Sequence, residues 1–253
     1  MVNQKSLKQL LDRKYNEYCN DEFIALDPIQ IPHYFSKKED IEIAGFLSAS
    51  IAWGQRPVII KNAKRLMQIM EYKPYDFILN HTEADRIGFN EFRHRTFLVE
   101  DVLFFVKSLQ NIYQKHGGLE DIFNKGYRKN KIKGAITELY QVFFEIEHLK
   151  RTRKHISNPA KKSAAKRLNM FLRWMVRKDQ SGIDFGIWKE MSTADLMLPL
   201  DVHTAKNARQ LGLLNCKSND WKAVEEVTEN LRKFDSSDPI KYDFALFGMG
   251  IYE

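Results

Sequence analysis

The sequence predicts an all-α protein, and three observations support this fold class. Glycine (12) and proline (7) are sparse in a chain of 253 residues. Apolar side chains recur at helical spacing along most of the chain, and no segment alternates polar and apolar residues as a half-buried strand would. A hydrophobic content of 43% and an aromatic content of 12% are typical of a folded globular protein.

Each predicted helix carries an apolar stripe at a spacing of three or four residues. The predicted helices cover residues 7–18, 41–51, 58–70, 102–113, 132–146, 163–175, 202–211, 221–231 and 242–246, with a single helical turn at 119–123. Asp40 and Ser218 are expected to cap helices, Pro57 to lie in a first turn, and Asp238 to open the last helix. The helix over 132–146 is expected to continue into the basic stretch that follows it.

Positive charge is concentrated in one stretch of the chain. The net charge is +7, but residues 150–178 contain eleven Lys and Arg and no Asp or Glu, so the rest is net acidic. A single basic stripe on an acidic body is typical of a protein with a polyanionic partner. The simpler alternative is a solvated face that keeps the protein soluble.

Cysteine usage and hydropathy exclude several classes. Two cysteines, Cys19 and Cys216, cannot form a disulfide framework or a four-cysteine metal or iron–sulfur site. The first residues lack the apolar core of a signal peptide, and no apolar run approaches the roughly 18 residues that span a bilayer. A cytoplasmic protein without a membrane partner is expected.

The segment Leu198–Leu214 places an acid at the start of a helix. Pro199 ends a short apolar lead-in, Asp201 follows, and Gly212 is positioned to end the helix. An Asp here most often only caps the helix by accepting a backbone N–H. A carboxylate held in that way also stays ionised, which suits a residue that must stabilise developing positive charge.

Two further segments combine a polar side chain with a helix end. Lys166 follows the small residues 163–165 at a helix start, and a lysine among other cations can have a lowered pKa and act as a nucleophile. Gln55 follows Gly54 at a helix end, where a glutamine could fill the gap left when a base leaves a duplex. A solvent-facing basic helix and a polar turn are the simpler and commoner interpretations of these two segments.

Together the three segments resemble the helix-hairpin-helix DNA glycosylase superfamily, which includes endonuclease III and the oxoguanine glycosylases. Residues 198–204, Leu-Pro-Leu-Asp-Val-His-Thr, are similar to the motif of the catalytic aspartate. Residues 163–169, Ser-Ala-Ala-Lys-Arg-Leu-Asn, resemble the second hairpin helix, which places a nucleophilic lysine in the bifunctional members. Residues 46–55 resemble an early helix whose closing glutamine approaches DNA. The order of these three motifs along the chain also agrees.

The resemblance implies two helical lobes around a cleft, one formed by residues 1–45 and 179–253 and the other by 46–178. It implies excision of a damaged base from double-stranded DNA, with Asp201 and Lys166 as catalytic residues and a lyase activity where Lys166 is the nucleophile. The residues expected to bind DNA are Gln55, Arg56, Lys161, Lys162, Arg167, Arg173 and His203. We expect a nucleoid-associated monomer that needs no metal and no organic cofactor.

The chain departs from the family pattern in the hairpin. Family hairpins usually carry a Gly-x-Gly turn that contacts a phosphate, but residues 158–164 contain no glycine, so Lys161 and Lys162 would bind the phosphate instead. Two alternatives therefore stay open. One is a non-catalytic nucleic-acid-binding protein that retains the glycosylase fold, and the other is a helical domain whose basic stripe meets an acidic protein.

Overall fold

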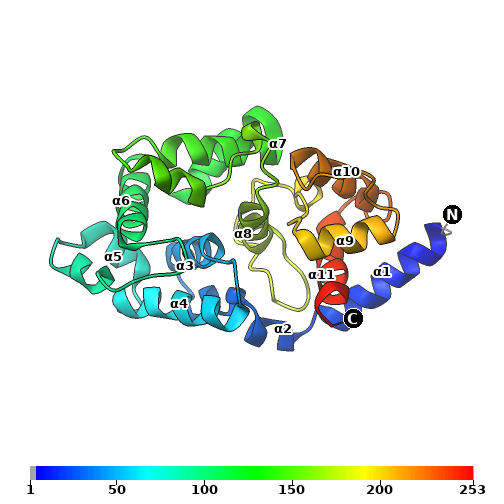
Figure 1. Cartoon of the computed structure of the whole chain (residues 1–253), viewed down its shortest axis with the longest axis horizontal. Helices are drawn as coiled ribbons and strands as arrows, with labels where there is room; N and C mark the ends of the chain where they lie inside the picture. Colours follow the sequence, from blue (N-terminus) through cyan, green and yellow to red (C-terminus); the bar gives the residue numbers. More distant parts are fainter. Residues whose placement is uncertain (1–3, 253) are drawn as a thin grey trace. The chain divides into compact units, whose positions relative to one another are not determined.

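The computed structural model of the chain describes residues 4–252 and confirms the all-α prediction. Within that range the regular structure consists of eleven α-helices and seven short 3-10 segments, denoted η, together with isolated bridges but no strand (Figure 1). None of the helices in this range combines the length and the apolar character that crossing a bilayer would require.

The chain folds into two compact units. Unit 1 comprises Met1–Ala25 and Asn158–Glu253, and unit 2 comprises Leu26–Ser157. The boundaries differ from those of the predicted lobes, because residues 26–45 belong to unit 2 and residues 158–178 to unit 1. The basic stretch is consequently divided between the two units.

Unit 1 is built on α11, which packs against both α1 and α9 (Figure 1). Its helices are α1 (Gln4–Tyr18), α2 (Asp21–Leu26), α8 (Lys166–Val176), α9 (Val202–Gln210), α10 (Trp221–Arg232) and α11 (Tyr242–Tyr252), with η5 (Pro159–Lys161), η6 (Thr193–Asp195) and η7 (Pro239–Lys241) between them. The predicted cap of α10 was wrong: Asp220, and not Ser218, accepts the N–H of Ala223 at 3.2 Å. Of the consecutive polar residues that precede this helix, only Asp220 occupies the capping position.

Unit 2 has an aromatic core. Its elements are η1 (Pro28–Gln30), η2 (Pro32–Tyr34), α3 (Lys38–Ser50), α4 (Arg56–Ile69), α5 (Pro74–Asn80), η3 (Asp85–Phe89), α6 (Val99–Lys115), α7 (Leu119–Phe143) and η4 (Lys150–His155). The buried ring of Phe105 lies 6.2 Å from Phe46 and 4.7 Å from Phe143, between ring centroids. Pro57 lies in the first turn of α4 as predicted. Asp40 does not cap α3, which begins two residues earlier; its carboxylate accepts the N–H of Tyr75 at 2.8 Å.

Helix α7 is two helical segments joined by a sharp turn at Asn130 and Lys131, whose backbone angles are not helical. A Cβ added to Gly126 would lie 2.3 Å from the carbonyl oxygen of Gly134, although eight residues of straight helix span about 12 Å. The two segments therefore fold back and pack against each other through paired glycines. The prediction of one turn at 119–123 and a helix running on into the basic stretch was wrong, since the second segment ends at Phe143.

We expect Gly126→Ala to destabilise the protein by about 1–3 kcal/mol, because the added methyl meets rigid backbone in a close contact. The matched control is Gly88→Ala, whose methyl would meet the side chain of Ile69, with Cγ2 at 2.9 Å, and no backbone atom of another segment closer than 3.9 Å. Urea unfolding of both variants measures the difference. Equal stability of the two variants would mean that the segments of α7 do not pack through Gly126.

Candidate functional site

Asp201 caps α9 as the sequence predicts. Its backbone is extended, and its Oδ1 accepts the N–H of Thr204 at 2.8 Å. The segment before Asp201 is held in place because the buried Leu198 donates its N–H to the hydroxyl of Thr228 at 3.1 Å. Gly212, with a φ of +71°, supplies the left-handed backbone that follows the end of the helix. The carboxylate is thus fixed by backbone and packing on both sides.

Lys166 is the first residue of α8, and its Nζ lies 2.9 Å from Oδ2 of Asp201. Two groups that are 35 residues apart in the sequence therefore meet at the starts of two helices. The side chain of Lys166 is 31% exposed and that of Asp201 is 16% exposed, so a ligand can reach the ammonium while the carboxylate is largely shielded. The ring of Phe247 on α11 lies 5.9 Å from the ammonium.

The backbone that leads to Lys166 adopts conformations that glycine usually provides. Lys162 has a φ of +67° and Ala165 a φ of +48°, both in the left-handed region. Each such residue costs roughly 1–2 kcal/mol relative to the right-handed conformation. Residues that carry side chains therefore occupy two strained backbone positions just before α8, and strain of this kind concentrates at functional sites.

Asp201 is ionised at neutral pH. Burial raises the pKa of its carboxyl, but the charge of Lys166 and the N–H of Thr204 lower the pKa by more, and the net result lies below the usual value. An ionised carboxylate fixed against an accessible amine can stabilise positive charge on a ligand bound beside them.

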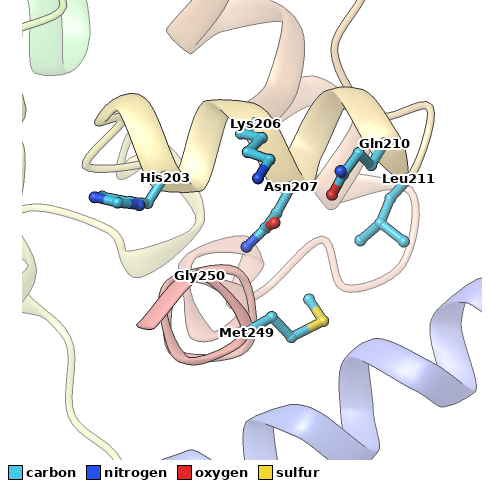
Figure 2. A pocket seen from close by; sticks show the side chains of 7 residues that line it. All are labelled: His203, Lys206, Asn207, Gln210, Leu211, Met249 and Gly250. Atoms are coloured by element: carbon cyan, nitrogen blue, oxygen red, sulfur yellow. The ribbon is translucent and has the colours of Figure 1, made fainter. Parts of the chain in front are cut away.

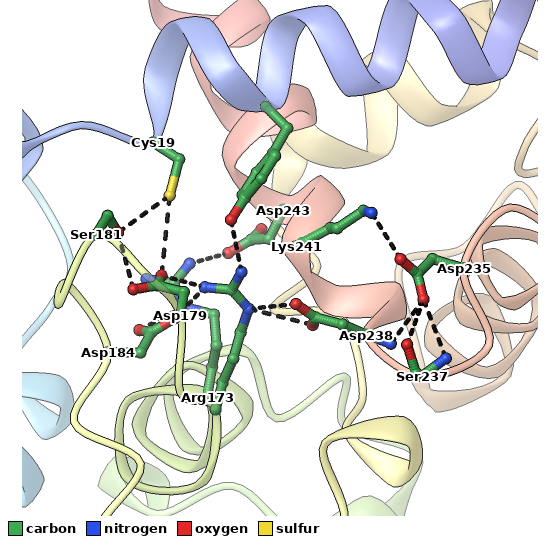
Figure 3. Close-up of polar contacts among 12 residues, drawn as sticks. Cys19, Arg173, Asp179, Ser181, Asp184, Asp235, Ser237, Asp238, Lys241 and Asp243 are labelled. Atoms are coloured by element: carbon green, nitrogen blue, oxygen red, sulfur yellow. Dashed lines mark hydrogen bonds and ion pairs between the residues drawn. The ribbon is translucent and has the colours of Figure 1, made fainter.

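Two arginines of unit 1 are buried in a network of carboxylates (Figure 3). Arg173 contacts Asp243 at 2.5 Å and Asp184 at 3.2 Å. Arg177 contacts Asp184 and Asp238, each at 2.9 Å. The side chain of Arg173 is only 4% exposed, so the guanidinium expected to meet a DNA phosphate is instead occupied inside the protein.

Asp243 was not singled out from the sequence. Burial raises its pKa to about 6, against the lowering effect of Arg173 and Lys166, and the charge of Asp201 raises it further. The charges of Lys166 and Asp201 both affect this pKa, so the protonation of Asp243 depends on the Lys166–Asp201 pair. The sequence feature that could have identified Asp243 is that it is the sole charged residue in the otherwise apolar sequence of α11.

The other predicted DNA-binding residues fall into two groups. Lys161, Lys162 and His203 are exposed in unit 1, whereas Arg167 is partly buried there, which lowers its pKa to about 10. Gln55 and Arg56 lie in unit 2, at the start of α4.

A groove of about 320 Å³ lies between α9 and α11 (Figure 2). It is lined by His203, Lys206, Asn207, Gln210, Leu211, Met249 and Gly250. Figure 2 shows His203 at one end of the groove, two residues after Asp201, and Gln210 and Leu211 at the other. Asn207 bridges the helices by donating to the carbonyl of Leu246 at 2.8 Å. The groove offers polar groups from α9, the helix that Asp201 caps.

Residues 27–252 match the family described as "Protein of unknown function (DUF2400)". Because this match spans most of the chain, the protein belongs to that family. No curated protein and no solved structure is significantly similar to it.

Asp243 predicts a pH dependence of stability. Its pKa of about 6 in the folded state exceeds the ordinary 3.8, so the folded protein binds a proton that the unfolded chain does not between these values. Wild-type stability should therefore gain, relative to Asp243→Asn, as the pH falls from 7 toward 4, by up to about 1.4 kcal/mol per unit of pKa difference.

Urea unfolding at about pH 7, 6 and 5 measures this gain for both proteins. The control is Asp220→Asn, since the pKa of the Asp220 cap is lowered by its backbone hydrogen bond with Ala223 and Asp220 stays ionised over this range. Parallel pH curves for wild type and Asp243→Asn would contradict the raised pKa.

Proposed function

We propose that this member of the family binds duplex DNA and excises a damaged base. The observation that supports the proposal most strongly is the 2.9 Å contact between Lys166 and Asp201, at the starts of α8 and α9. The resemblance to the helix-hairpin-helix glycosylases was drawn from motifs alone, and it requires these two side chains to act together. Their contact is the arrangement that such a reaction needs.

The two side chains have different roles in the proposed reaction. As the bond from C1′ to the base breaks, the base leaves with the electron pair and positive charge develops on the sugar, where the ionised Asp201 stabilises it. The ammonium of Lys166 gives up a proton, which balances the charge of the departing base, and the amine nitrogen bonds to C1′. As the C1′–O4′ bond opens, O4′ keeps the electron pair and takes a proton shed by the nitrogen, which leaves a protonated imine at C1′ that permits strand cleavage.

Surface cations of unit 1 would hold the DNA backbone at this site. Lys161 and Lys162 are exposed just before α8, and neutralised phosphates release counterions, which makes such binding depend on salt. Arg173 takes a different role from the one expected, because its contacts with Asp184 and Asp243 support α8 and α11. His203 would contact the DNA from the end of the α9–α11 groove.

A non-catalytic nucleic-acid-binding protein is the second candidate. The observation that favours it is the lack of glycine between residues 158 and 165, where side chains hinder the backbone from approaching a phosphate. Such a protein would bind duplex DNA with strong salt dependence and release no base.

The catalytic pair is tested with duplexes that carry an abasic site or an oxidised base. Lys166→Gln should abolish the adduct trapped by borohydride, and Asp201→Asn should slow base release by about a hundredfold or more. Lys222→Gln, on the exposed face of α10, is the matched control and should behave as wild type. Base release that survives Lys166→Gln but not Asp201→Asn would indicate a monofunctional enzyme. Reactions unchanged in both variants would exclude the assignment.

Replacing Lys162 by glycine is expected to raise the stability of the fold and to weaken DNA binding. Glycine at this left-handed position should stabilise the fold by about 1 kcal/mol, because it relieves the strained backbone. The same Lys162→Gly change should weaken duplex binding, because it removes a cation that contacts phosphate. Urea unfolding and fluorescence anisotropy measure the two effects. Tighter or unchanged binding by this variant would show that Lys162 does not contact the DNA.

A further inference from the structure

We infer that unit 2 carries a second phosphate-binding surface for duplex DNA, formed by residues 53–56, 92–97 and 150–155. We call this the three-loop surface. The inference rests on the proposed DNA binding but not on base excision. All three loops lie within unit 2, and the site proposed for catalysis lies within unit 1.

Two buried histidines hold the loops together around Trp53. Nε2 of His94 donates to the carbonyl of Trp53 at 3.0 Å, and its ring meets the Trp53 ring edge-on at 4.8 Å. The ring of His155 stacks on Trp53 at 5.8 Å. Arg151 donates to the carbonyl of Thr96 at 3.1 Å, which joins the second and third loops. The surface is therefore assembled before any ligand binds.

A buried carboxylate fixes the third loop. Asp101 accepts the N–H of Leu98 at 2.9 Å and the hydroxyl of Thr152 at 2.7 Å. The same carboxylate contacts Arg151 at 3.0 Å and His155 at 3.2 Å. Because Asp101 is fully buried and surrounded by donors, it anchors the loop without placing an unpaired negative charge on the surface.

Positive charge remains exposed on this scaffold. Arg93, Arg95 and Lys154 are exposed, and none of them pairs with a carboxylate among residues 4–252. Three exposed acids lie within three residues of the loops. Two of them already face an arginine, since Glu91 lies 3.6 Å from Arg65 and Glu100 lies 3.9 Å from Arg151, and the third is Glu147. Arg93, Arg95 and Lys154 can therefore serve an external anion.

The backbone is strained where Arg95 crosses the first loop. Arg95 has a φ of +54°, a left-handed conformation that costs a side-chain-bearing residue about 1 kcal/mol or more. Its side chain lies over Gly54, where a Cβ would be 2.8 Å from Nη1 and 3.1 Å from Cδ. Gly54 itself has a φ of +105°. The strain places a guanidinium against the peptide that precedes Gln55, the exposed residue proposed to enter the opened duplex.

The composition of the surface favours a phosphate backbone over an acidic protein. Its cations are mainly arginines, whose planar donor groups match two phosphate oxygens at once. The exposed amide of Gln55 lies beside them and can form hydrogen bonds with the edges of bases. A protein partner has no such bases. We therefore assign duplex DNA as the partner of the three-loop surface.

The test is the salt dependence of binding to a short undamaged duplex, measured by fluorescence anisotropy with the full chain. Arg93→Ala combined with Arg95→Ala should lower the slope of log affinity against log salt by about two, the loss of two phosphate contacts. Arg93→Ala combined with Lys154→Ala leaves the packing of Arg95 on Gly54 intact and should give the same decrease. The control, Lys73→Ala with Lys107→Ala, removes equal charge from exposed positions outside the three loops and should keep the wild-type slope.

Wild-type slopes in both double variants would overturn the inference. Competition by polyglutamate would also overturn it. If polyglutamate displaced the labelled duplex as effectively as unlabelled DNA of equal charge, the surface would fit an acidic protein. The two proposals are tested separately, because adduct formation by the wild type tests the reaction, whereas the change of slope between the wild type and the double variants tests this surface. A reduced slope without base excision by wild type supports the three-loop surface and excludes the proposed reaction.

Discussion

Unit 1 is organised around the ion pair that joins Lys166, at the start of α8, to Asp201, at the start of α9. Arg173 and Arg177 follow Lys166 by seven and eleven residues and lie on the same side of the helix. Both are buried among carboxylates. Unpaired buried charges are costly, so α8 has few alternative positions against its neighbours. Asp243 contacts Arg173, and the charges of Lys166 and Asp201 both affect its pKa, so the buried network is electrostatically coupled to the Lys166–Asp201 pair.

Much of the fold follows from apolar periodicity. The spacing of buried side chains locates most of the helices, and Pro57 and Asp201 mark two starts because their chemistry suits only a first turn or a cap. The reversal inside α7 could not be predicted, since the turn is formed by Asn130 and Lys131, and neither is the glycine or proline that usually marks a turn. The close contact that makes the reversal possible involves Gly126 and Gly134, which in the sequence look like ordinary helix interruptions.

The candidate site was only partly predictable. The partnership of Asp201 and Lys166 came from the resemblance to a family, because no periodic pattern relates residues 35 positions apart. The basic stretch looked uniform, but burial divides it: Arg173 is enclosed by carboxylates, whereas Lys161 is exposed. Asp243 was missed because its role depends on burial and on neighbours supplied by other helices. Charge can be counted in a sequence, but its partners appear only in the fold.

The central claim is that the amine held against Asp201 is the group that bonds to the sugar. Its most direct test is tandem mass spectrometry of the peptides from a borohydride-reduced adduct of the wild-type chain with a damaged duplex. The predicted result is a sugar-derived modification on Lys166. A modification on another lysine or on the terminal amine, or no modified peptide with any damaged duplex, would contradict it.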